Sequence, residues 1–356
     1  MIELFRPLKI RQIELKNRIA VSPMCQYSSR DGFANEWHMV HLGSRAVGGA
    51  ALVMTEATAV SPEGRISIDD LGIWKDEHID YLKKITDFIL QQNSVPGIQL
   101  AHAGRKSSRT SPWNGDRVLS IEEGGWETVA PSAIPFSEDT AIPVELSKEG
   151  IGKVVSDFKS AAIRALKAGF RVAEIHGAHG YLMHEFMSPL TNQRKDEYGG
   201  SFENRIRLLM EVVAAIRSVW PDEYPVFVRI SSIDWRNDGW TLDESVDLAA
   251  LLKKNGVDLL DCSSGGAVPG LEIKPGPGYQ VQFAEEIRRK TGIMTGAVGI
   301  ITTPAQAEEI LSSGQADIVS LAREFLRDPY FPLHAAMALG VDVPWPVQYE
   351  RAKRKN

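Results

Sequence analysis

Eight short apolar runs, each followed by a longer amphipathic stretch, limit more than any other feature what this chain can fold into. The runs span residues 19–22, 51–55, 97–101, 172–175, 226–230, 257–261, 292–295 and 317–321. Helical patterns occupy residues 77–91, 148–168, 202–219, 242–255, 281–291 and 304–312. Strands that are buried on both faces need not alternate polar and apolar residues. Eight such strands alternating with helices predict an α/β protein with the (β/α)8 TIM-barrel fold.

A doubly wound parallel sheet is the main alternative fold for this pattern. It would be expected to carry a glycine-rich dinucleotide-binding turn after its first strand, whereas residues 23–27 read Pro-Met-Cys-Gln-Tyr. Neither an internal repeat nor a linker marks a second domain, so residues 1–356 are expected to form a single barrel domain. Three long connections, residues 102–147, 183–201 and 262–280, are expected to form a lid or pocket at one face, the first as a long loop or capping insertion.

Composition narrows the possible partners. The 356-residue chain has a formal net charge of -6 and 43% hydrophobic residues, which is typical of a globular protein and gives no electrostatic reason to expect nucleic acid or an anionic membrane as partner. Its two cysteines, Cys25 and Cys262, provide neither a disulfide framework nor an iron–sulfur site. The N-terminus lacks the apolar core of a signal peptide, and no apolar run is long enough to cross a bilayer, so a cytoplasmic location is expected.

The fourth apolar run ends in the residues with the clearest chemistry. Directly after it come His176, His179 and Tyr181, separated by glycines and an alanine. Two imidazoles can donate hydrogen bonds to one oxygen, and a phenol nearby can give up a proton, which is the equipment for polarising a carbonyl and protonating a neighbouring carbon. Two alternatives remain open: the histidines can be structural, or they can be metal ligands, although neither an HxH pair nor an HExxH helix is present.

Other polar groups follow the remaining strands, where the active site of a barrel is built. They include Gln99 in the third strand and Arg229 at the end of the fifth. A buried arginine needs an anionic partner, either a carboxylate or the anion of a reduced flavin. Gly299 after the seventh strand and Arg323 after the eighth fit a phosphate site, where backbone N–H groups, a helix N-terminus and a guanidinium face an anion. Taken singly, each feature is better explained as an ordinary turn glycine or a surface arginine.

Several motifs in register resemble the old yellow enzyme family of FMN-dependent ene reductases. They are residues 23–27 (Pro-Met-Cys-Gln-Tyr), 99–106 (Gln-Leu-Ala-His-Ala-Gly-Arg-Lys), 176–182 (His-Gly-Ala-His-Gly-Tyr-Leu) and 192–201 (Asn-Gln-Arg-Lys-Asp-Glu-Tyr-Gly-Gly-Ser). Cys25 and the ending at residues 346–351 (Pro-Val-Gln-Tyr-Glu-Arg) are similar to the thermophilic-like subgroup. The resemblance covers essentially the whole chain.

The resemblance implies a role for each residue at the strand ends. His176 and His179 would bind the carbonyl oxygen of the substrate, and Tyr181 would be the proton donor. Tyr27, Lys106 and Arg351 would contact the substrate or line its pocket, Lys106 alternatively as a ribityl contact. The residues implied to bind FMN are Pro23, Met24, Cys25, Ala57, Gln99, Arg229, Gly299, Ala322 and Arg323. No metal is expected.

The implied reaction is the reduction of an activated alkene, such as an α,β-unsaturated carbonyl compound, with NADPH or NADH as electron donor. Hydride would reach the alkene from flavin N5 and the proton from Tyr181, in two half-reactions at one site. The subgroup also implies a homo-oligomer, a dimer or tetramer, in which Arg351 reaches the neighbouring active site, although this chain continues for five residues beyond it. A reductase of the dienoyl-CoA type, a non-catalytic flavin-binding protein and a zinc-dependent barrel hydrolase are the alternatives.

Overall fold

The computed structural model describes residues 2–353 and contains a closed barrel of eight parallel strands in the order β10-β11-β12-β3-β4-β5-β8-β9. Its strands are β3 (Ile19–Val21), β4 (Leu52–Ala59), β5 (Val95–Ala101), β8 (Val172–Gly177), β9 (Val226–Ser231), β10 (Leu259–Ser263), β11 (Met294–Ala297) and β12 (Ile318–Leu321). Each corresponds to one of the eight apolar runs, so the predicted TIM barrel is confirmed.

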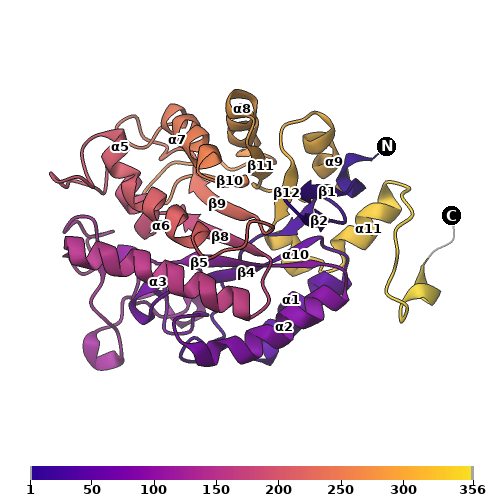
Figure 1. Ribbon diagram of the computed structural model, residues 1–356, viewed down its shortest axis with the longest axis horizontal. Helices are drawn as coiled ribbons and strands as arrows, with labels where there is room; N and C mark the ends of the chain where they lie inside the picture. Colours follow the sequence, from indigo (N-terminus) through magenta and orange to yellow (C-terminus); the bar gives the residue numbers. More distant parts are fainter. Residues whose placement is uncertain (1, 354–356) are drawn as a thin grey trace.

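Helices surround the barrel (Figure 1). They are α1 (Glu36–Val47), α2 (Ile79–Gln91), α3 (Lys148–Lys167), α4 (Leu182–Met187), α5 (Phe202–Arg205), α6 (Arg207–Arg217), α7 (Leu242–Lys254), α8 (Val281–Thr291), α9 (Pro304–Ser312), α10 (Arg323–Arg327) and α11 (Phe331–Ala338). Local chemistry sets several of their starts: Ser147 caps α3, and Thr241 with Glu244 forms a capping box on α7. The helix expected over residues 202–219 is interrupted at Ile206, which ends α5 and precedes α6.

Two apolar layers stabilise the barrel. The larger lies between the strands and the helices. The smaller contains barrel residues such as Leu52, Met54 and Phe227, and the side chains of Ile10 and Leu15 pack against it. The last two come from a hairpin of β1 (Leu8–Ile10) and β2 (Ile13–Leu15). With one end of the barrel filled by apolar side chains, polar chemistry is confined to the carboxyl ends of the strands.

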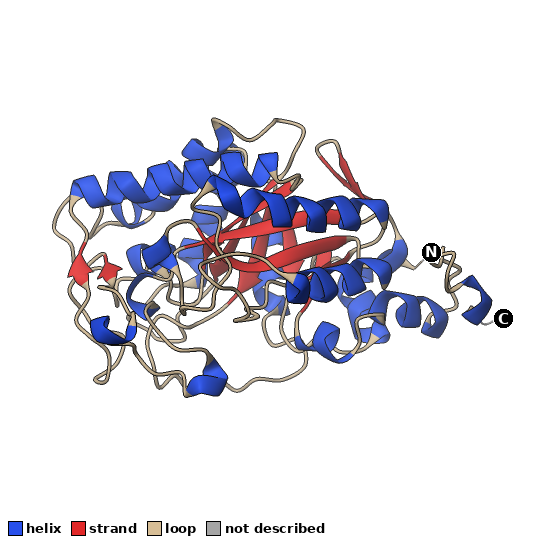
Figure 2. Cartoon of the chain, turned by 90° about the horizontal axis from the view of Figure 1, so that it is seen from below, coloured by secondary structure: helices blue, strands red, loops and turns tan. Residues whose placement is uncertain are grey.

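The long connections gather at one end of the barrel, and both chain termini lie at the other (Figure 2). The connection 102–147 contains the short 3-10 helices η4 (Gly104–Lys106), η5 (Pro112–Asn114) and η6 (Ile121–Glu123). It also contributes β6 (Val129–Ala130), which pairs in parallel with β7 (Val144–Glu145). No helix within residues 2–353 combines the length and apolar character that spanning a membrane requires.

Candidate functional site

The loop after β8 brings His176, His179 and Tyr181 together. The His176 ring packs edge-on against both of the others, with ring centroids 5.1 Å from His179 and 4.9 Å from Tyr181. The backbone N–H of Ala178 donates to Nδ1 of His176 over 3.2 Å. Since Nδ1 accepts, the proton of the neutral ring is on Nε2, and His176 is a hydrogen-bond donor through that atom.

His179 has a side-chain partner that the sequence did not indicate. Its Nε2 lies 2.7 Å from the Ser263 hydroxyl at the end of β10. If the hydroxyl donates to Nε2, the proton of the ring is on Nδ1, and His179 can donate from there to a ligand. Its backbone is in the left-handed region at φ 62°, and its N–H donates to Ser231 Oγ over 2.9 Å.

Electrostatics keep these groups neutral. Burial lowers the pKa of both His176 and His179 well below the usual value, and the nearby Arg229 lowers it further. Burial likewise raises the pKa of Tyr181 well above the usual value. At neutral pH the site therefore holds two uncharged imidazoles and a protonated phenol.

Lys106 lies in the wall of the pocket beside Tyr181, with its ammonium 5.2 Å from the centroid of that ring. Nζ donates to the carbonyl oxygen of His179 over 2.8 Å. Burial lowers the pKa of Lys106 to about 8. Lys106 was expected either to line the substrate pocket or to contact the ribityl chain of FMN, and these contacts favour the first role.

Arg229 is buried and has a carboxylate partner, which was one of the two possibilities open from the sequence. Its Nε lies 3.3 Å from Oδ2 of Asp261 on the adjacent strand β10, and one terminal nitrogen donates to Ser22 Oγ over 3.2 Å. Within residues 2–353, neither this Nε nor Asp261 Oδ1 has a hydrogen-bond partner. Asp261 was not predicted, although a carboxylate directly after the apolar pair Leu259–Leu260 was the signal that could have found it.

Gln99 is oriented by a second unpredicted acid. Its Nε2 donates to Glu174 Oε1 over 2.8 Å, because the two residues are register partners on β5 and β8. The amide oxygen of Gln99 remains as an acceptor for another donor. Burial raises the pKa of Glu174 to about 8, and the nearby Asp261 adds to this, so the acid is largely protonated at neutral pH.

The residues after β3 form another wall. Pro23, Met24, Cys25 and Tyr27 are all partly buried in this segment. It is attached to β4, since the N–H of Gln26 donates to Glu56 Oε2 over 2.9 Å. Tyr27 contacts Trp113 of the long connection edge-on at 5.6 Å. Ala57 is buried on β4 and is the register partner of Gln99.

Cys25 carries a neutral thiol. Burial, with the Asp70 and Glu56 carboxylates adding to it, raises the pKa of Cys25 well above its usual value. A neutral thiol is a poor nucleophile, which agrees with the expectation that Cys25 does not act through a thiolate.

A cavity of about 290 Å³ joins the ends of β9 to β12. Its lining includes Arg229, Ser263, Gly299, Ala322 and Arg323. Gly299 has a φ of 129°, and a Cβ there would lie 3.3 Å from the backbone nitrogen of Gln280, so a larger residue would be strained. The helix α10 that Arg323 begins has only five residues, so the guanidinium and loop N–H groups are the main anion donors, rather than a helix dipole.

These residues fit the flavin that the sequence implied. The Nε of Arg229, which pairs with Asp261 without a hydrogen bond to the described residues, the amide oxygen of Gln99 and the cationic Arg323 are a donor and acceptor set suited to a ring with amide-like edges and to a phosphate. Because Ser263 both lines the cavity and contacts His179, the His179 imidazole lies next to the same space.

Arg351 is not brought to this site of its own chain. It is exposed on η7 (Glu350–Ala352), in a segment that extends past α11 at the edge of the molecule (Figure 1). Within residues 2–353 the histidines, cysteines and carboxylates form no group of three or more placed to hold a metal ion.

Comparisons with known proteins agree with the fold and with the family that the sequence resembles. Residues 3–340 match the model of the NADH:flavin oxidoreductase / NADH oxidase family. An NADPH dehydrogenase of Geobacillus sp. (strain WCH70) is 51% identical over 353 residues, which cover 99% of this chain and 98% of that protein. A solved structure of morphinone reductase in complex with tetrahydroNAD is 27% identical, with a TM-score of 0.78, and the match covers 97% of this chain and 93% of the other. A 2-naphthoyl-CoA reductase is 26% identical with a TM-score of 0.85, but only 52% of its longer chain is covered.

Fold and site together define a barrel flavoenzyme that takes electrons from a nicotinamide. The chain belongs to the NADH:flavin oxidoreductase / NADH oxidase family, as the resemblance to old yellow enzymes predicted. It is an FMN-dependent NAD(P)H oxidoreductase.

Proposed function

We propose that this oxidoreductase is an ene reductase, which uses NADPH to reduce the C=C bond of α,β-unsaturated carbonyl compounds. The observation that carries the proposal is the cluster of two neutral imidazoles and a protonated phenol beside the cavity. Bound FMN would supply the hydride chemistry, with Gln99 and Arg229 at its ring, Gly299, Ala322 and Arg323 at its phosphate, and Pro23, Met24, Cys25 and Ala57 completing the pocket.

The histidines and the tyrosine divide the remaining work. His176 donates through Nε2 to the carbonyl oxygen of the substrate, where negative charge develops as the alkene is reduced. His179 donates to the same oxygen through Nδ1 in the tautomer in which the Ser263 hydroxyl donates to its Nε2. Tyr181 delivers the proton to the α-carbon, and its raised pKa keeps that proton on the phenol until the carbon is basic enough to take it. Neutral imidazoles stabilise the oxygen without protonating it outright.

The direct test is anaerobic and separates the two half-reactions. The FMN-loaded protein is first reduced with NADPH, then mixed with 2-cyclohexen-1-one, and the return of flavin absorbance is followed together with formation of cyclohexanone. Saturated cyclohexanone is the control and should leave the flavin reduced. A flavin that NADPH reduces but that only oxygen reoxidises would contradict the ene reductase assignment. Repeating the first step with NADH tests the preference for NADPH, which rests on the named relatives.

We also propose a cytoplasmic homo-oligomer in which Arg351 contributes to the neighbouring active site. Its exposure at the edge of the molecule supports this role. If it is correct, light scattering shows an oligomer, and Arg351→Ala raises the KM for the alkene without changing FMN content. A monomer with full activity would contradict it.

A further inference from the structure

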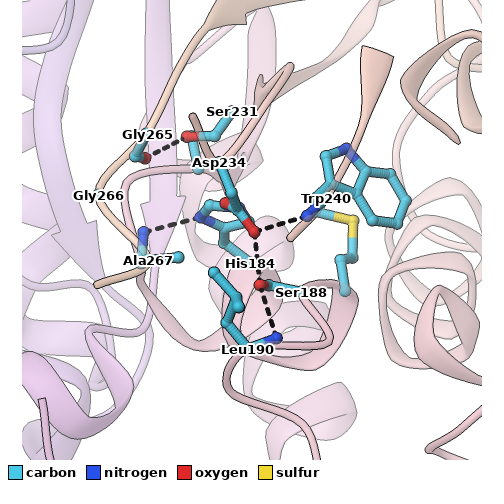
Figure 3. Close-up of polar contacts among 12 residues, drawn as sticks. His184, Ser188, Leu190, Ser231, Asp234, Trp240, Gly265, Gly266 and Ala267 are labelled. Atoms are coloured by element: carbon cyan, nitrogen blue, oxygen red, sulfur yellow. Dashed lines mark hydrogen bonds and ion pairs between the residues drawn. The ribbon is translucent and has the colours of Figure 1, made fainter. Parts of the chain in front are cut away.

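A buried acid and histidine lie directly behind the loop that carries His179 and Tyr181. His184 on α4 and Asp234 after β9 are both fully buried. Nε2 of His184 is 3.0 Å from Oδ1 of Asp234, although the N–H bond is not aligned with that oxygen, so the contact is chiefly electrostatic. Figure 3 shows Asp234 between His184, Ser188 and Trp240. Its Oδ2 accepts hydrogen bonds from Ser188 Oγ over 2.6 Å and from the backbone N–H of Trp240 over 2.8 Å.

The other ring nitrogen of His184 reaches the catalytic loop. Nδ1 accepts a hydrogen bond from the backbone N–H of Gly180 over 2.9 Å. Gly180 is the single residue between His179 and Tyr181. Because Nδ1 accepts, the proton of the ring is on Nε2, which faces the Asp234 carboxylate. Asp234 therefore stabilises the tautomer that can hold Gly180, as a buried carboxylate does for a catalytic histidine in other enzymes.

Burial alone would raise the pKa of Asp234, but His184 and the hydrogen bonds from Ser188 and Trp240 outweigh it, so its pKa lies below the usual value. The carboxylate is thus charged in the interior. Apolar side chains of similar size often stabilise a core at least as well as a buried polar pair, so stability is a weak reason for this one.

Neighbouring contacts hold the rest of the loop. The N–H of His179 donates to Ser231 Oγ, which donates in turn to the carbonyl of Gly265 over 2.7 Å. The segments also touch through their backbones, since a Cβ on Gly180 would lie 2.0 Å from the carbonyl oxygen of Gly266. With Lys106 on the His179 carbonyl, the bond to His184 completes the set of side chains that hold the peptide groups between the two catalytic side chains.

We infer that His184 and Asp234 are positioning residues for proton delivery: they set the Gly180 peptide, and through it the relative placement of His179 and Tyr181. This inference rests on the proposed ene reductase function for its kinetic consequence, but the hydrogen bond itself can be tested without cofactor or substrate.

The experiment compares three variants with a matched control. His184→Leu removes the acceptor but keeps an apolar side chain, whereas His184→Asn places an amide oxygen where Nδ1 was and can still accept from Gly180. Asp234→Asn keeps the volume but places an amide N–H group against His184 Nε2. This favours the tautomer with the proton on Nδ1, which cannot accept the hydrogen bond from the Gly180 N–H. The control is His78→Asn, because His78 is also buried but contacts the carbonyl oxygen of Asp31.

Two measurements are made on each protein. Hydrogen–deuterium exchange on FMN-free protein should show faster exchange in the peptide spanning residues 177–183 for His184→Leu and Asp234→Asn, and exchange close to wild type for His184→Asn and the control. In FMN-loaded protein, the first two variants should slow flavin reoxidation by the enone about tenfold to a hundredfold while NADPH reduces the flavin at the wild-type rate. His184→Asn should recover most of this loss.

Unchanged exchange of that peptide in His184→Leu and Asp234→Asn would overturn the inference. So would equal slowing of both half-reactions that follows the loss of melting temperature, since that is the signature of a residue that only packs. If the wild-type enzyme itself fails to reduce the enone, the proposed function is wrong, while the exchange result still decides whether His184 and Asp234 hold the loop.

Discussion

Arg229 is the residue for which the sequence left two partners open, a carboxylate and a flavin, and one substitution series can separate them. The ion pair with Asp261 is deeply buried, with exposed fractions of 6% for Arg229 and 2% for Asp261. At 3.3 Å and an effective dielectric constant of about 20, the attraction between unit charges is about 5 kcal/mol. Arg229→Met fills similar space and removes the charge, which leaves Asp261 buried and unpaired.

We expect Arg229→Met to lower the free energy of unfolding of FMN-free protein by about 3–5 kcal/mol at neutral pH. The loss should shrink as pH falls. Burial already raises the pKa of Asp261, and removing Arg229 raises it further, so protonation at low pH relieves the unpaired charge. Adding Asp261→Asn removes that charge at every pH, and the double variant should recover most of the stability. Urea unfolding midpoints, monitored by tryptophan fluorescence and circular dichroism, measure the stability of the single and the double variant at each pH.

FMN affinity then separates structure from function. If Arg229 also binds the flavin, the stable double variant should still bind FMN about tenfold to a hundredfold more weakly than wild type, which is the effect of losing one charge-assisted hydrogen bond. Wild-type affinity in the double variant would refute the flavin contact and leave Arg229 as a structural residue. A double variant as unstable as Arg229→Met would refute the ion-pair argument itself.

Further predictions concern single groups of the site. Arg323→Ala should weaken FMN binding about tenfold to a hundredfold in a fluorescence titration, with the melting temperature of FMN-free protein unchanged because the side chain is exposed. Tyr181→Phe should slow flavin reoxidation by an enone far more than flavin reduction by NADPH, and stopped-flow traces in which both steps slow equally would contradict its role as proton donor. Cys25→Ala should shift the flavin reduction potential by about 30 mV, equivalent to roughly 1.4 kcal/mol, without abolishing turnover; complete loss of activity with FMN bound would instead indicate covalent chemistry. The pKa of Glu174 is raised to about 8 in the folded protein, so stability is lost as pH rises from its usual pKa through that value. The melting temperature of Glu174→Gln should therefore fall less than that of wild type between about pH 6 and pH 9.

The barrel could be predicted because its strands are buried on both faces and appear as uninterrupted apolar runs. The helix α1 was not predicted from the sequence, and the reason is physical. It buries His38, His41 and Arg45 and leaves Trp37 and Val40 exposed, which inverts the amphipathic pattern of an outer helix. Similarly, α4 lies in an expected loop, and all six of its residues are buried, so it has no polar face to reveal a helical period.

The groups proposed to meet a ligand could be picked out from the sequence, since they follow strand ends in the chain. Their partners were not, because pairing depends on register between strands distant in sequence. Gln99 meets Glu174 across 75 residues, and His179 meets Ser263 across 84. A charged residue inside an apolar run, such as Glu174, is nevertheless a usable signal, because burying it needs a compensating partner.

The unpredicted acids also explain how the barrel can receive an anionic cofactor. Glu174, Arg229 and Asp261 form a buried group in which burial raises the pKa of both acids. With Glu174 protonated and Asp261 paired with Arg229, the group is close to neutral, so the interior beneath the cavity adds no net negative charge. A second ionised carboxylate there would oppose both a phosphate and a reduced flavin, whereas Arg323 at the cavity adds a positive charge that favours them. If Gln99 and Arg229 hold the flavin as proposed, the neutral form of Glu174 is the state that suits them best, and we expect weaker FMN binding above about pH 8 from the same charge balance.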